Sequence, residues 1–208
     1  MKIKIVNCNL GNVKSVSNMI YNIGYESDII TSPNELESSD LTILPGVGSF
    51  DEAMTNLELQ GWIQPLTDYA IFNKKPLLGI CLGMQLLTQE SQEGKKNGLG
   101  FIKGRTVAFD KVKMKHNEKI PHMGWNTVSV KKEKDLFKKT EEKQRFYFVH
   151  SYHVELDHTE DILTTTKNGY EFISSLMHGN IIGVQFHPEK SHRFGFNFLR
   201  SIIKKFEK

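Results

Sequence analysis

The chain has 208 residues, a formal net charge of +3 and 38% hydrophobic residues, which suffices for one compact α/β domain with a full core. Acidic residues are mixed into the lysine-rich segments at residues 111–119 and 131–139, so the charge argues against a nucleic-acid-binding face. Two cysteines make no disulfide framework, which favours a reducing cytoplasmic setting, and no apolar run is long enough to span a membrane.

The first half of the chain alternates predicted strands with predicted helices. Apolar runs predict strands at residues 3–7, 27–30, 41–44 and 77–80. Helical spacing of apolar residues follows the first, third and fourth of these strands, and a single helical turn is expected at residues 33–38. Asn12 would cap the first helix and Gly24 would end it. This alternation predicts an α/β fold with a doubly wound, mostly parallel sheet, helices on both faces, and ligands at the carboxyl ends of the strands.

From about Gly98 the pattern changes to short β-like segments separated by turn residues. These segments lie at residues 106–109, 127–130, 145–149, 162–166, 172–177 and 181–185. We expect them to form a smaller antiparallel portion, which either completes one side of the sheet or makes a second one. A closing helix is predicted over residues 191–206, with Phe194, Phe198, Ile202 and Phe206 buried. The whole chain, 1–208, is expected to be a single domain.

The most informative stretch joins the fourth predicted strand to the helix after it. Cys81 stands at this join between Gly79 and Gly83, which is a G-x-C-x-G form of the nucleophile elbow. The glycines would let the backbone pass close, and the helix N-terminus would favour the thiolate. The N–H of Leu82 would face the same position and stabilise an oxyanion. The alternative is a buried structural cysteine in a strand-to-helix turn.

A base for this thiol is predicted at His187. It follows the predicted strand at 181–185 and precedes Pro188, which favours extended backbone at His187. Residues i and i+2 of an extended chain project the same way, so Glu189 would lie beside His187 and fix the imidazole tautomer. Alternatively, Glu189 favours only the N-terminus of the next helix. The order nucleophile, histidine, acid differs from that of α/β-hydrolases.

Two of these stretches carry a specific resemblance. Residues 79–85, G-I-C-L-G-M-Q, and residues 185–189, Q-F-H-P-E, resemble the class I glutamine amidotransferases. Within that class the chain is similar, essentially end to end, to the HisH glutaminase subunits of imidazole glycerol phosphate synthase. The stretches that carry this closer resemblance are residues 45–50, 98–100, 121–126, 148–152 and 187–191.

The resemblance implies a role for each matching residue. Cys81 would attack the side-chain carboxamide of glutamine, and His187 would protonate the departing ammonia and then activate water against the thioester. Glu189 would orient His187, and the N–H groups of Leu82 and, after a turn adjustment, Val47 would form the oxyanion hole. The implied glutamine-binding set is Gly46, Gly48, Gln85, Glu93, Ser151 and Tyr152. Ordinary surface polarity is the alternative for the side chains of Gln85 and Glu93.

A partner is also implied. Ammonia released into neutral water is mostly protonated and loses its nucleophilicity, and the amidase domain is expected to use all 208 residues. The resemblance therefore implies a heterodimer with a HisF-type (β/α)8 cyclase subunit, which would make imidazole glycerol phosphate and aminoimidazole carboxamide ribotide in histidine biosynthesis. The residues that match the family's partner surface are Asn12, Trp125, Tyr147 and Lys190, for which plain surface packing is the alternative. No cofactor or metal is expected.

One stretch departs from the family pattern. The family usually begins with D-Y-G-x-G-N, whereas residues 7–12 here read N-C-N-L-G-N. The helix cap remains, but the acidic and aromatic pair is missing near the expected partner surface. Some HisH-like chains supply ammonia, with a HisF-like partner, for amidination of a surface-polysaccharide sugar, and that alternative stays open. A non-catalytic binding module and a stand-alone cysteine hydrolase are less compatible with the Cys81–His187–Glu189 set and with Gln85.

Overall fold

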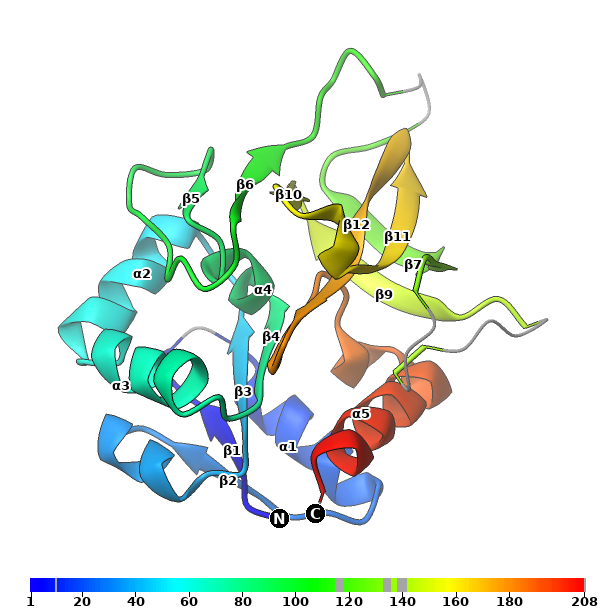
Figure 1. The fold of residues 1–208 in the computed structure, drawn as a ribbon. Helices are drawn as coiled ribbons and strands as arrows, with labels where there is room; N and C mark the ends of the chain where they lie inside the picture. Colours follow the sequence, from blue (N-terminus) through cyan, green and yellow to red (C-terminus); the bar gives the residue numbers. More distant parts are fainter. Residues whose placement is uncertain (10, 115–117, 133–135, 138–141, 208) are drawn as a thin grey trace.

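The structure is a computed structural model that describes residues 1–9, 11–114, 118–132, 136–137 and 142–207 (Figure 1). Its central feature is a parallel sheet in the order β2-β1-β3-β4-β13. These strands are β1 (Ile3–Val6), β2 (Ser27–Ile30), β3 (Leu41–Gly46), β4 (Leu77–Cys81) and β13 (Ile181–Val184). The predicted doubly wound sheet is therefore confirmed for the half of the sheet that carries Cys81.

The same sheet continues past β13 in mainly antiparallel pairing, in the order β12-β10-β6-β5. The bounds are β5 (Glu90–Ser91), β6 (Gly104–Ala108), β10 (Tyr152–Leu156) and β12 (Tyr170–His178), with β11 (Ile162–Asn168) and β8 (Ser129–Val130) off this path. A separate antiparallel pair is formed by β7 (His122–Thr127) and β9 (Arg145–His150). Both expected arrangements of the second half, an extension of the sheet and a small second sheet, thus occur together.

Helices cover the two faces of the parallel strands (Figure 1). On one face α1 (Val13–Asn22) and α5 (His192–Phe206) share a hydrophobic cluster with Ile5 and Ile43. On the other face α2 (Phe50–Leu59), α3 (Ile63–Thr67) and α4 (Leu82–Leu86) pack on a cluster that includes Val6 and Leu44. The successive strand residues Ile5 and Val6 serve opposite faces because strand side chains alternate. Among the described residues, no helix is both long and apolar enough to cross a membrane.

Shorter helical segments connect these elements. They are η1 (Pro33–Ser38), η2 (Asp68–Phe72), η3 (Thr159–Asp161) and η4 (Pro188–Lys190). The expected turn at 33–38 is therefore confirmed. Asn12 caps α1, since its Oδ1 accepts a hydrogen bond from the Ser15 N–H at 3.3 Å, and Gly24 follows the helix with φ +91°.

Several boundaries differ from the prediction. The strand expected at 127–130 is split, because Thr127 ends β7 and only 129–130 form β8. The prediction missed β10, although its sequence Y-H-V-E-L alternates apolar and polar residues as a strand does. In α5, Phe198 and Ile202 are buried, but Phe194 and Phe206 are only partly buried at the edge of the core. Cys8 is buried in the turn after β1, and burial raises the pKa of its thiol to about 11.

Candidate active site

Cys81 stands at a strained turn between β4 and α4. Its backbone has φ +55° and ψ −109°, which is an uncommon conformation for a residue with a side chain. A Cβ atom on Gly83 would lie 1.9 Å from the carbonyl oxygen of Leu44, and one on Gly79 would lie 2.6 Å from the carbonyl oxygen of Gly83. Only glycine fits at both positions, so the G-x-C-x-G pattern forms the tight elbow that the sequence predicts.

His187 and Glu189 lie together beside this elbow. The strand β13 pairs in parallel with β4, which brings the residues after Val184 to the same edge of the sheet as Cys81. His187 Nδ1 and Glu189 Oε1 are 2.7 Å apart, and both side chains are almost fully buried. Since Glu189 is a carboxylate, His187 donates from Nδ1, and its Nε2 is the atom left for chemistry.

The charge state of His187 is set by its two neighbours. Burial by itself lowers the pKa of His187, but its interactions with Cys81 and Glu189 outweigh burial and raise the pKa to about 10. Among the described residues, the buried Nε2 of His187 has no hydrogen-bond partner. Cys81 Sγ lies 3.8 Å from the carbonyl oxygen of Val149, to which it donates, and 3.7 Å from Gln185 Nε2, from which it accepts. The site therefore places an imidazole that is charged at neutral pH beside the sulfur of Cys81.

A cavity of about 350 Å³ opens in front of the thiol. Its lining residues are Val47, Gly48, Cys81, Leu82, Gln85, Glu93, Pro121, Val149, His150, Ser151 and Tyr152. The turn after β3 forms one wall, because Gly46 pairs with Cys81 across the β3–β4 ladder and Val47 follows it. Gly48 has φ +103°, a conformation that favours glycine. A larger cavity of about 640 Å³ lies next to Asp40 and Pro76, at the amino-terminal ends of the strands and away from the thiol.

Two polar side chains, those of Gln85 and Glu93, line this cavity. Gln85 donates from Nε2 to the carbonyl oxygen of Tyr152 at 3.0 Å and to Gln185 Oε1 at 3.0 Å. Glu93 Oε2 accepts a hydrogen bond from the Phe50 N–H at 3.0 Å, at the start of α2. Burial raises the pKa of Glu93, although the hydrogen bond from Phe50 lowers it. An amide and a carboxylate thus flank the space in front of Cys81.

Sequence reasoning missed four residues of this site: Pro121, Val149, His150 and Gln185. Gln185 stands in the Q-F-H-P-E stretch, two residues before His187, but its contact with Cys81 arises only from the pairing of β13 with β4. Val149 and His150 reach the cavity from β9, in the second sheet. Their place depends on how two distant segments pack, which strand periodicity does not reveal.

The residues expected to meet a partner form an aromatic and cationic group on one side of the site. The ring centroids of Trp125 and Tyr147 are 6.3 Å apart, and Lys190 Nζ lies 5.7 Å from the centroid of the Tyr147 ring. Trp125 stacks on His192 with centroids 5.4 Å apart and an interplanar angle of 8°, yet 46% of Trp125 is exposed. The side chain of Asn12 accepts the capping hydrogen bond at the start of α1.

Comparison with known proteins agrees with this geometry. Residues 4–203 match the family described as glutamine amidotransferase class-I. The chain is 48% identical over 202 residues to imidazole glycerol phosphate synthase subunit HisH 2 of Methanococcus maripaludis, covering 97% of this chain and 98% of that relative. It is 46% identical over 203 residues to subunit HisH of Sulfurimonas denitrificans, covering 97% of each chain.

Solved structures share the fold. PurLQS from Thermotoga maritima superposes with a TM-score of 0.77 at 19% identity, covering 99% of each chain. A solved glutamine amidotransferase superposes with a TM-score of 0.76 at 14% identity, covering 99% of each chain. At these identities the likeness concerns the fold alone.

Proposed function

This chain belongs to the class I glutamine amidotransferases and, within them, to the HisH subunits of imidazole glycerol phosphate synthase, and we propose that Cys81 carries its glutaminase chemistry. The observation that supports this proposal most strongly is the position of Cys81 on a strained elbow with φ +55°, beside the buried His187–Glu189 pair. A binding module of the same fold has no need of a nucleophile, a base and an orienting carboxylate together.

The proposed reaction proceeds in two halves. Cys81 Sγ attacks the side-chain carbonyl carbon of glutamine as the thiolate, with its proton already on His187, and the oxyanion is held by the N–H groups of Leu82 and Val47. As the tetrahedral intermediate collapses, the C–N bond breaks and His187 gives its Nε2 proton to the departing ammonia. The raised pKa of about 10 keeps His187 protonated for that step. Nε2 then takes a proton from water, whose oxygen attacks the thioester. The C–S bond breaks, which releases glutamate and restores the thiolate beside the His187 imidazolium.

We propose that the cavity holds glutamine by its two ends. The carboxamide would lie at Cys81, and the Glu93 carboxylate would bind the α-ammonium group on the other side of the cavity. Gln85 and the backbone of Ser151 and Tyr152 would line the substrate between these ends. The hydrogen bond from the Phe50 N–H supports this role for Glu93, because it fixes one carboxylate oxygen and leaves the other for substrate.

The partner in this proposal is a HisF-type (β/α)8 cyclase, bound as a heterodimer through the surface of Asn12, Trp125, Tyr147 and Lys190. It would receive the ammonia directly and make imidazole glycerol phosphate and aminoimidazole carboxamide ribotide. The relatives are named as subunits of a synthase, which supports a partner chain. Partner binding would move the turn at Val47 and complete the oxyanion hole. The free thiol of Cys81 suits the reducing cytoplasm.

Glutamate release by the purified chain tests this proposal. We expect glutaminase activity that rises strongly when the cyclase-type partner from the same organism is added together with its ribotide substrate. Cys81→Ala should abolish it. Absence of glutamate with every partner would overturn the assignment of Cys81.

A second candidate, ammonia supply for amidination of a surface-polysaccharide sugar, is favoured by the atypical turn before α1. There Cys8 is buried, Asn9 has φ +63° and its N–H is bound by Asn7 Oδ1 at 3.3 Å; Leu10 lies outside the described residues. Several relatives are numbered HisH 2, which implies a second HisH chain in those organisms. Activation by a HisF-like chain together with a sugar amidotransferase, but not by the histidine-pathway cyclase, would identify this function.

A further inference from the structure

Two buried histidines that the proposed mechanism does not use lie next to the glutamine cavity. His122 begins β7 and His150 ends β9, and the two residues are paired directly across this small sheet. His122 Nδ1 and His150 Nε2 are 2.9 Å apart, and each residue is only 6% exposed. His150 itself lines the cavity.

In the series Asn126–His122–His150–Tyr152, the donor and the acceptor of each hydrogen bond can be assigned from the groups at the two ends. His150 Nδ1 is 2.8 Å from the carbonyl oxygen of Tyr152, which only accepts, so Nδ1 carries the proton and the neutral ring accepts at Nε2. His122 must then donate from Nδ1 and accept at Nε2. Its donor is Asn126 Nδ2, at 3.0 Å. The Asn126 amide is oriented by the Lys167 carbonyl, to which Nδ2 donates, and by the Thr127 N–H, which donates to Oδ1.

Burial keeps both rings neutral, as this arrangement requires. It lowers the pKa of His122 to about 4 and that of His150 well below its usual value, with the nearby His153 and His187 lowering the latter further. A second proton on His150 would face the Nδ1–H of His122, and one on His122 would face the amide hydrogens of Asn126. The chain of hydrogen bonds therefore has one direction, from Asn126 toward Tyr152.

This series of hydrogen bonds ends at the backbone carbonyl of Tyr152, a residue that lines the glutamine cavity. The Tyr152 carbonyl oxygen accepts from His150 and also from Gln85 Nε2 at 3.0 Å. The second hydrogen on Gln85 Nε2 goes to Gln185 Oε1, so both amide hydrogens are used. In the part of the chain that the structure describes, Gln85 Oε1 accepts no hydrogen bond and remains available to a ligand in the cavity.

We propose that His122 and His150 are positioning residues for glutamine, holding the Tyr152 carbonyl so that Gln85 presents its Oε1 to the substrate. This inference rests on the proposed glutaminase function. It assigns the two histidines no contact with the reacting atoms; they act on substrate affinity through Tyr152 and Gln85.

Substitutions at His150 test the roles of its Nδ1 and Nε2 atoms separately. His150→Phe keeps a ring but removes the donor to Tyr152, whereas the amide of His150→Asn occupies the position of Nδ1 and retains that donor. Removing one of the two donors to the Tyr152 carbonyl should weaken glutamine binding by about 10-fold, on the scale of one lost hydrogen bond. We therefore expect about a 10-fold rise in the inhibition constant of a glutamine-like diazoketone, 6-diazo-5-oxo-norleucine, in His150→Phe but not in His150→Asn.

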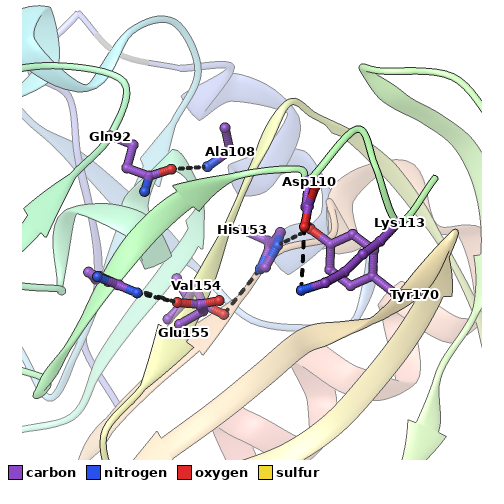
Figure 2. Close-up of polar contacts among 9 residues, drawn as sticks. Gln92, Ala108, Asp110, Lys113, His153, Val154, Glu155 and Tyr170 are labelled. Carbon is purple, nitrogen blue, oxygen red and sulfur yellow. Dashed lines mark hydrogen bonds and ion pairs between the residues drawn. The ribbon is translucent and has the colours of Figure 1, made fainter.

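His153 provides a matched control. It is a third buried histidine, and it contacts the same aromatic residue, Phe109, with ring centroids 4.9 Å apart. Figure 2 shows that its ring points to Tyr170, and Nε2 lies 2.9 Å from the Tyr170 hydroxyl. His153 is not among the residues that line the glutamine cavity. His153→Phe is thus the same chemical change in the same core, and it should lower stability without changing the diazoketone constant.

The experiment measures labelling of Cys81 in the purified full chain by the diazoketone and, separately, by iodoacetamide, which reaches the same thiol but carries no amino-acid group for the glutamine site to bind. Support consists of a raised inhibition constant in His150→Phe, a maximal labelling rate within about twofold of the original chain, and unchanged iodoacetamide labelling. Where His150→Phe does not fold, His150→Gln replaces it, because it also lacks the Nδ1 donor.

Two results overturn the inference. One is an unchanged inhibition constant in the variants that lack the donor; the other is an equal rise in His153→Phe, which would show a general effect of core damage. Failure of the proposed function is distinguishable, because the original chain would then react with iodoacetamide but not with the diazoketone.

Discussion

Gln185 donates a hydrogen bond from Nε2 to Cys81 Sγ at 3.7 Å, while its Oε1 accepts one from Gln85 at 3.0 Å. Gln185 is fully buried, directly after β13. A donor aimed at sulfur favours the thiolate over the thiol. One side chain therefore connects the proposed nucleophile to the proposed glutamine-binding amide.

Gln185→Leu should lower kcat/KM for glutamine about 10-fold, because it removes the donor to Cys81 and leaves a buried Gln85 hydrogen unpaired. Gln185→Glu should lower it further, about 100-fold, because a carboxylate beside the sulfur disfavours the thiolate. Steady-state glutaminase assays with the partner subunit present measure both. Normal kinetics in Gln185→Leu would show that this link has no role in the reaction.

The role of Gln185 was not predictable from the sequence, whereas the His187–Glu189 pair was. The pair depends on a spacing of two residues along one extended segment, and Cys81 on a local turn between glycines. Gln185 acquires its role only because β13 pairs with β4, a contact between segments more than 100 residues apart. His122 and His150 likewise meet only through the β7–β9 register. The sequence thus predicts contacts between residues that are close along the chain, but not contacts that depend on the pairing of distant strands.

Glu189→Gln should lower kcat/KM for glutamine about 100-fold, on the scale of general acid–base catalysis. The amide oxygen can still accept from His187 Nδ1, but it does not stabilise the imidazolium.

The pKa of His187 is raised from 6.5 to about 10, so its interactions stabilise the folded chain fully below pH 6.5 and are lost as the pH rises to about 10. The stability difference between the two chains in urea unfolding should therefore be larger near neutral pH than at high pH. A pH-independent difference would contradict this charge assignment.

Acid should destabilise the chain below pH 6.5, because three buried histidines are neutral in the folded state. Burial lowers the pKa of His122, His150 and His153, so the unfolded chain binds more protons than the folded one. The stability that these three neutral histidines contribute is thus complete above pH 6.5 and is lost as the pH decreases toward about 4, the value for His122. His153→Phe removes one titrating group and should reduce the slope by up to about 1.4 kcal/mol per pH unit. An unchanged slope in urea unfolding would show that His153 is not neutral when folded.

Gly83→Ala should destabilise the chain by about 3 kcal/mol or more, because its Cβ would lie 1.9 Å from the Leu44 carbonyl oxygen. The matched control is Gly24→Ala. Gly24 has φ +91° with open space around it, so alanine there adds only backbone strain of about 1 kcal/mol. Thermal unfolding of both variants measures the difference. Equal losses would show that the elbow relaxes to admit a side chain.

Trp125→Ala should weaken binding of the cyclase-type partner by about 30-fold or more, the size expected for a central aromatic anchor. Trp125 suits that role because 46% of it is exposed while its ring is held by stacking on His192. Phe72→Ala is the matched control, since Phe72 is an exposed aromatic residue in η2, on the segment between α3 and β4 and outside the proposed partner surface. Calorimetric titration measures both affinities, and circular dichroism checks the fold. Equal affinity in the two variants would mean that the partner does not dock on Trp125, and the proposed heterodimer surface would have to lie elsewhere on the chain.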